Sequence, residues 1–510
     1  MFSARRLFLN LVTSFGTFLI TTLVNFFLTP FIVRSLGPDA YGFISLGNAA
    51  IGYLSLATVA LNSMAGRFIA ISIYKGEQKQ AEQYFSSVLI ANVVLSAILL
   101  LGSGLVIAFI EHLISVPAIL LTQVRLLFSF VVISFCINIC TSLQGICFFV
   151  KNSLYLQSIR GLLENLIRAA CILLLYLLLP PKLYYIGLVA IFINVFTITW
   201  NIHYKRRLLP FLRIKLSEFS WKRVKELLSS GLWNVISLMG VQLFTGLDLV
   251  FANLFVSTQA MGILAIAKII PTSLSSVIMT LAATFAPDIT ERVAKDDKNG
   301  ISFRMKFYIR LLGLFISIPA GIFCVIGTDF YRLWIPSQDA YQVQILSVLS
   351  IAGLCIIGAA SSMYDLYLAL NKVRQYSIAE FGFALINITC ILVLVKVTDL
   401  GIYAIAGVSS IIIILQSVIF IWPYGARVLG LKWWVFFPSA VRAVIALVVV
   451  LIIALGARQF IQVESWTDLI VLVIILSCIS LVANMFVLFT RYERLAIIRR
   501  VRKMMSGMGK

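Results

Sequence analysis

Two oppositely charged residues lie inside long apolar runs, where a charge is costly and is therefore a candidate for function. Asp248 and Lys268 occur in the consecutive apolar runs 229–255 and 262–286. If both runs are helices that cross a membrane, both residues lie ~10 Å below the same surface. We therefore predict that they pair. Lys268 is then a candidate contact for an anionic ligand. Asp248 is a candidate for tuning Lys268 or for binding a coupling cation. The alternative is that the two residues form a structural ion pair.

A second charged group recurs with helical spacing. Arg160, Glu164 and Arg168 are four residues apart, so they share one face of the apolar run 161–180. Arg160 would lie near the membrane surface and Arg168 ~12 Å deeper. A net positive face of this kind can draw an anion inward. The alternative is that a neighbouring helix neutralises the stripe.

Amide side chains in the apolar runs are further candidates, because they can bind hydroxyl groups or, equally well, neighbouring helices. The amide candidates are Asn25, Asn48, Asn234 and Gln242. Arg67, a cation at the end of the second run, is a further candidate. The sequence contains no cluster typical of a catalytic or metal centre, since His112 and His203 are isolated and the eight cysteines lie in apolar runs without a CxxC pair. We therefore expect no catalytic residue, metal or cofactor apart from a coupling ion, H⁺ or Na⁺.

The composition indicates the class of protein in which these residues lie. Of the 510 residues, 61% are hydrophobic and 12% are charged, against about 45–50% and about 25% in soluble proteins. This excludes an ordinary soluble enzyme and a disordered chain. The net charge of +21 does not indicate a nucleic-acid partner, because the cations lie in short loops between apolar runs.

The chain contains fourteen apolar runs long enough to cross a bilayer as helices. We predict an all-α polytopic membrane protein. The first run has no small-residue cleavage site and is too long for a signal peptide. The predicted spans are 10–33, 41–63, 87–110, 126–149, 161–180, 185–202, 229–255, 262–286, 307–327, 344–368, 378–397, 401–421, 439–460 and 468–490.

Positive charges are distributed unequally between the two sides of these spans. The side that holds Met1 carries 32 of the 41 Lys and Arg residues and the other side carries six. This bias predicts that both termini are cytoplasmic. The longest loop, 203–228, reads as a basic amphipathic helix on the inner membrane surface, where anionic lipids attract it.

The sequence contains an internal repeat at an offset of 219 residues. In the window 151–175, nine of 25 residues are identical to those of the second copy. The offset carries six spans onto six spans in the same orientation, which is typical of one class of transporters. It predicts an N-lobe at 1–202, a linker at 203–228, a C-lobe at 229–421, and a last segment, 422–510, with two extra spans and a basic tail. Two such lobes can enclose a central cavity that opens to either side in turn; a structural bundle is the alternative.

The segment LTPFIVRSLGPDAYGFISL (28–46) resembles the polysaccharide-exporter (Wzx-type) family of the MOP superfamily of flippases. The fourteen spans, the two lobes, the basic loop and the extra spans are similar to that family as well. The resemblance therefore implies the MOP flippase fold.

The resemblance also implies a function. Family members move oligosaccharides on a polyprenyl diphosphate from the cytoplasmic to the outer leaflet of the bacterial inner membrane for O-antigen, capsule or exopolysaccharide assembly. It implies membrane lipids and a lipid-linked oligosaccharide as partners, with a polymerase and a chain-length regulator as candidates. Lys268 would then meet the diphosphate or an acidic sugar, and the protein would be a transporter, not an enzyme.

Two other classes remain open. A drug or cation antiporter of the same superfamily typically has twelve spans and buried carboxylates in its first lobe, whereas residues 40–110 contain acids only at Glu77 and Glu82, in a loop. A polytopic polymerase or glycosyltransferase generally needs a large outer loop. The longest one here, 328–343, is short.

Overall fold

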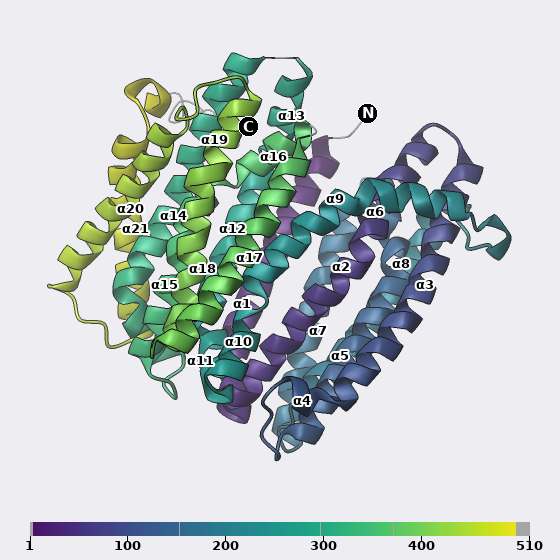
Figure 1. Cartoon of the computed structure of the whole chain (residues 1–510), viewed down its shortest axis with the longest axis horizontal. Coiled ribbons are helices and arrows are strands. Elements are labelled where there is room, and N and C mark those ends of the chain that lie inside the picture. The colour runs from purple at the N-terminus through teal and green to yellow at the C-terminus, as the bar shows by residue number, and fades with distance from the viewer. Residues whose placement is uncertain (1–3, 152, 296, 371, 496–510) are drawn as a thin grey trace. The chain divides into compact units, whose positions relative to one another are not determined.

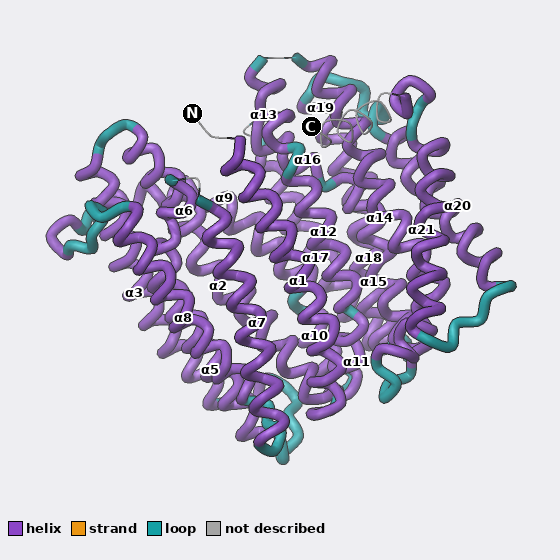
Figure 2. The backbone as a smooth tube through the Cα atoms, turned by 180° about the vertical axis from the view of Figure 1, so that it is seen from behind, coloured by secondary structure: helices purple, strands orange, loops and turns teal. Residues whose placement is uncertain are grey.

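The protein is all-helical in the computed structural model, which describes residues 4–151, 153–295, 297–370 and 372–495. No strand occurs in these ranges, and loops join the helices (Figure 1, Figure 2). Fourteen helical stretches within them are long and apolar enough to cross a membrane. The predicted fold class is confirmed.

The spans agree with the predicted runs in number and order. Their observed bounds are Gly16–Leu36, Pro38–Ile73, Gln78–Ala108, Leu121–Phe148, Leu154–Leu178, Tyr185–Leu208, Gly231–Phe255, Thr258–Val293, Lys298–Trp334, Ala340–Ala360, Val373–Val397, Ile402–Val428, Phe437–Arg458 and Trp466–Leu488.

Several spans are composite, because the helix is interrupted inside them. The helices are α1 (Ala4–Leu36), α2 (Pro38–Tyr74), α3 (Gln78–Ala108), α4 (Ile110–Leu113), α5 (Leu121–Thr141), α6 (Ile146–Val150), α7 (Leu154–Leu178), α8 (Tyr185–Leu208), α9 (Trp221–Thr245), α10 (Asp248–Phe255), α11 (Thr258–Ala267), α12 (Ile269–Ala283), α13 (Ala286–Ala294), α14 (Lys298–Trp334), α15 (Ala340–Ala360), α16 (Ser362–Ala369), α17 (Val373–Val397), α18 (Ile402–Gln416), α19 (Trp422–Val428), α20 (Phe437–Arg458) and α21 (Trp466–Leu488).

The basic segment 203–228 is not the single amphipathic helix that the sequence predicted. Its first residues complete α8, its last ones begin α9, and only a short 3₁₀ turn, Leu216–Glu218, lies between. The interruption follows from Pro210, because proline has no N–H to donate and disfavours helical geometry in the residue before it. The side chains of Leu216 and Trp221 are 80% and 56% exposed.

The chain divides into two compact units, Met1–Ala265 and Ile266–Lys510. This boundary follows packing and lies inside the eighth span. The lobes at 1–202 and 229–421 follow sequence duplication and stay a prediction. Within the first unit α1 packs on α7, α5 packs on α3 and α8, and α2 packs on α9.

Glycines bring α2 into backbone contact with the helices that follow it in the first unit. A Cβ atom on Gly262 would lie 2.3 Å from the carbonyl oxygen of Pro38, and one on Gly42 would lie 3.0 Å from the Cα of Gly262. A Cβ atom on Gly231 in α9 would lie 2.1 Å from the carbonyl oxygen of Ala60. Only residues without a side chain permit such close approach.

The second unit is built around α14, which packs on α15, α20 and α21. Two ion pairs fasten the last two spans to its opposite ends. Asp329 lies 3.2 Å from the guanidinium of Arg458 in α20. Arg310 lies 2.6 Å from the carboxylate of Glu493, just after α21, and their side chains are 7% and 10% exposed.

Glu493 is more acidic than an ordinary glutamate. Burial alone would raise the pKa of its carboxyl, but hydrogen bonds from Arg310 and Thr490 outweigh burial and lower that pKa. A depressed pKa in the folded state means that the pair stabilises the fold at neutral pH and that this contribution is lost as the pH falls.

We expect Gly262→Ala to lower the free energy of unfolding by about 1–3 kcal/mol, because the new methyl group would collide with the backbone of α2. The thermal midpoint of the detergent-purified protein measures this. Gly104→Ala in α3 is the control, since a Cβ there meets nothing within 4 Å. Equal midpoints for the two variants would contradict the close contact.

We expect Glu493→Gln to lower the free energy of unfolding at pH 7 by about 3 kcal/mol, because Arg310 would remain buried without its counter-charge. The difference from the parent protein should begin to narrow as the pH falls below the ordinary pKa of glutamate, about 4.3, and should disappear only below the lowered pKa of Glu493 in the folded state. Thermal unfolding across pH measures both effects. Glu291→Gln is the control, since its pair with Lys295 is 64% and 67% exposed and should contribute less than about 1 kcal/mol. A difference that grew in acid would refute this account.

Candidate functional site

The helices of the seventh and eighth spans are interrupted beside the two predicted charges. The seventh span breaks at Gly246 and Leu247, and Asp248 begins α10 with 2% of its surface exposed. The eighth span breaks at Lys268, directly before α12. Interrupted spans with free helix ends are typical of substrate and ion sites in transporters.

The first of these charges, Asp248, is placed favourably for its own helix. A carboxylate in the first turn of α10 interacts favourably with the positive end of the helix dipole. The unit boundary between Ala265 and Ile266 separates Asp248 from Lys268. Their pairing therefore stays a prediction.

Two of the three charged residues predicted to share a face of α7, Arg160 and Glu164, form an ion pair that is neutral overall. The Nε atom of Arg160 lies 2.9 Å from Glu164, and the side chains are 17% and 20% exposed. From α8, Asn201 accepts a hydrogen bond of 2.6 Å from Arg160, and the Thr197 hydroxyl donates to Glu164. This half of the face therefore fits the structural alternative: one charge offsets the other, and a neighbouring helix holds both.

Arg168, two turns further along α7, has a different environment. Its Nη2 atom donates to the side-chain oxygen of Asn25 in α1 at 2.7 Å and to that of Asn165 at 2.8 Å. Its buried Nε has no hydrogen-bond partner. Among the described residues no carboxylate forms an ion pair with it. The structure thus brings two predicted residues, Asn25 and Arg168, together around a half-buried positive charge without a counter-charge.

The other predicted residues have differing environments. The Gln242 amide donates to the backbone oxygen of Ala49 at 3.2 Å, and Tyr53 donates to its backbone oxygen at 3.2 Å, so Gln242 joins α9 to α2. Asn48 and Arg67 are exposed on α2. The side chain of Asn234 lies outside the described part of the structure.

Three further polar residues escaped the sequence reasoning. Thr197 and Asn201 lie in an apolar run, and only the packing of α8 on α7 relates them to the charged face. Glu380 in α17 is 4% exposed and accepts a hydrogen bond from Gln416. The predicted eleventh span, 378–397, begins two residues before Glu380, whereas α17 begins at Val373, so Glu380 lies two turns into the helix.

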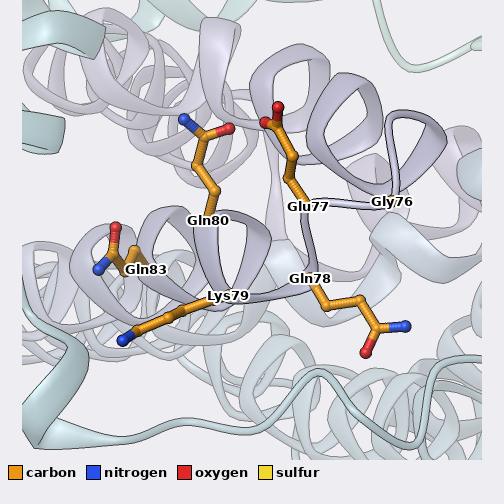
Figure 3. A pocket seen from close by; sticks show the side chains of 6 residues that line it. All are labelled: Gly76, Glu77, Gln78, Lys79, Gln80 and Gln83. Carbon is orange, nitrogen blue, oxygen red and sulfur yellow. The ribbon is translucent and has the colours of Figure 1, made fainter.

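The structure also has a hollow at the end of the second span and the start of the third. A shallow depression of 580 Å³ lies where α2 turns into α3. Figure 3 shows Glu77 and Gln80 on one side of it and Lys79 pointing away from both. None of the predicted intramembrane residues lines it, so it is a surface feature of the loop and not the candidate site.

The fold is shared with solved membrane transporters. A multidrug resistance MATE family transporter of the MOP superfamily, in an inward-facing conformation, matches 82% of this chain and 98% of its own, with a TM-score of 0.69 and 13% identity. Lipid II flippase MurJ, in an inward closed conformation, matches 94% of this chain and 98% of its own, with a TM-score of 0.68 and 14% identity. These likenesses confirm the MOP fold, whose solved examples are described as transporters and flippases.

Sequence comparison identifies the family. The membrane protein EpsK of Bacillus subtilis (strain 168), itself described as uncharacterized, is 29% identical over 497 residues, which cover 97% of this chain and 98% of EpsK. The family model of polysaccharide biosynthesis proteins matches residues 10–292, more than half of the chain. The chain is a multi-pass membrane protein that belongs to the polysaccharide biosynthesis protein family, with the fold of the MOP superfamily.

Proposed function

We propose that this protein is a flippase that moves oligosaccharide units linked to a polyprenyl diphosphate from the cytoplasmic to the outer leaflet of a bacterial inner membrane. The observation that carries the proposal is Arg168, a cation within membrane-spanning helices to which the described part of the chain supplies no counter-charge. The family supports a polysaccharide precursor as the substrate. O-antigen, capsule or exopolysaccharide assembly would consume the exported unit.

The physical problem that such a protein solves is desolvation. Each sugar hydroxyl that enters hydrocarbon without a hydrogen-bond partner costs several kcal/mol, and a bare phosphate charge costs far more. A guanidinium offers paired donors that fit phosphate oxygens. Arg168 presents that group, and Asn25 and Asn165 orient it. The headgroup would therefore lose its hydrating water and contact the Arg168 guanidinium and the amides of Asn25 and Asn165 instead.

The remaining predictions fit the same cycle. Lys268, at the break between α11 and α12, would contact the diphosphate or an acidic sugar. Alternating access would expose the headgroup to one side of the membrane and then to the other, with both termini cytoplasmic as the loop charges indicate. A polymerase and a chain-length regulator are the proposed protein partners.

A drug or cation antiporter fits the chain less well. The MATE transporter covers 82% of the chain and the flippase MurJ covers 94%. The uncompensated charge of α7 is positive, and a positive charge repels a cationic drug. Both observations favour a substrate with an anionic headgroup.

We expect Arg168→Ala to reduce the amount of surface polysaccharide at least about tenfold, a loss of about 1.4 kcal/mol of binding, at unchanged membrane abundance. The measurement uses cells whose own gene is deleted and replaced by the variant. Arg125→Ala is the matched control, because Arg125 is paired with Glu111 and exposed. Arg168→Lys should give an intermediate loss, since it keeps the charge but not the paired donors. Normal polysaccharide in Arg168→Ala cells would refute the proposed site.

We expect Lys268→Ala to reduce export as well, at normal membrane abundance, because a cation would be lost where the headgroup passes. The same cells and immunoblots measure it. Lys396→Ala is the control, since Lys396 is exposed in the last turn of α17. If export were equal in the two variants, Lys268 would have no role in the substrate path.

A further inference from the structure

Glu380 is a buried acid in the second unit that the proposed substrate path does not use. It lies two turns into α17, where it packs toward α18, and 4% of its surface is exposed. The side-chain amide of Gln416, the last residue of α18, donates to its Oε2 atom. The Tyr376 hydroxyl, one turn earlier on α17, is its second hydrogen-bonding partner.

No positive charge compensates this carboxyl within the described residues. On its own helix Arg374 and Lys396 lie nearer the two ends, and α18 and α15 carry no charged residue at all. The remaining titratable groups of the neighbouring helices α16 and α19 are Asp365, Tyr364, Tyr367, Tyr424 and Arg427. Tyr364 and Tyr367 reach Tyr376 through ring contacts and not the carboxyl itself.

An ionised carboxylate in such surroundings is strongly unfavourable, and a buried acid without a counter-ion takes up a proton instead. A protonated carboxyl both donates and accepts a hydrogen bond. The same interface holds two buried oxygen atoms without a hydrogen-bond partner, Oε1 of Gln416 and Oδ1 of Asn387, on side chains that are 0% exposed. The interface is therefore built for a neutral, proton-bearing acid and not for a salt bridge.

The backbone beside Glu380 is irregular. Residues Ser417–Ile421 form a π-helix directly after Gln416, between α18 and α19. Short π-helical turns inside α-helices are frequent at functional sites, because they carry one extra residue per turn. Gln416 therefore sits at the junction of two helical geometries, where a small change of register would withdraw its amide from Glu380.

We propose that Glu380 is a proton-binding site whose occupancy drives the transport cycle, with Gln416 closing the site in the conformation described here. A proton from the aqueous phase on one side joins the carboxylate, and the neutral acid permits α17 and α18 to pack closely. Separation of Gln416 from Glu380 admits water, and the proton leaves to the other side. The inference deepens the proposed function, because it names the coupling ion, and the link to export rests on that function.

The first test reads the proton itself and needs no substrate. We expect infrared spectra of the purified protein in lipid at neutral pH to show a protonated carboxyl band that Glu380→Gln removes. Two control variants distinguish the band of Glu380 from those of other acidic residues. Asp365→Asn should leave the Glu380 band, and Glu164→Gln should leave it as well, because Glu164 forms an ion pair with Arg160. A band that persists in Glu380→Gln would overturn the site.

The second test connects the site to transport. Glu380→Gln is expected to reduce export at least about tenfold, within the usual range of coupling between sites, and to make the residual export insensitive to collapse of the pH gradient. Asp365→Asn should keep both the export and its sensitivity. If the infrared band were lost but export stayed normal, proton binding would be real and the coupling wrong. Failure of the proposed substrate would appear separately, as normal polysaccharide in Arg168→Ala cells.

Discussion

In hydrocarbon, every charge must find its partner inside the protein, and this constraint decides how each polar residue of the chain can be understood. Arg160 and Glu164 in α7 obey it in the simplest way, because they neutralise each other. Arg310 does the same with Glu493, just after the last span, and this pair fastens that span to α14. Arg168 and Glu380 do not, because neither has an opposite charge beside it among the residues that the structure describes. Incomplete neutralisation is what distinguishes a functional candidate from a structural pair in this protein.

The two exceptions call for different solutions. Arg168 is half-buried and oriented by Asn25, so an anion from outside the protein can bind it and neutralise its charge. Glu380 is buried and accepts a hydrogen bond from Gln416. In our proposal its charge is neutralised by a proton. In our proposals the first unit thus supplies the attraction for an anionic headgroup, and the second supplies a switch that responds to the proton gradient.

The sequence predicts the number and order of the spans because hydrocarbon thickness imposes length and apolarity on each helix. It also predicts the charged face of α7, since helical spacing relates Arg160 to Arg168. What it misses depends on tertiary contacts or on helix ends. The Asn201 and Thr197 partners come from α8 and have no periodic relation to α7. Glu380 lies near the start of its apolar run but two turns into α17, because the helix begins before the run. The basic segment 203–228 is not one helix, because Pro210 interrupts it.

The contact between α2 and α11 restricts the route of the lipid. Where Gly262 meets Pro38, the two backbones touch with no side chain between them. No acyl chain fits through such a junction, so lipid cannot diffuse sideways from the bilayer into the protein at this point. In the proposed function, a polyprenyl tail that remains in the membrane while its sugar crosses would therefore slide along a different face of the protein.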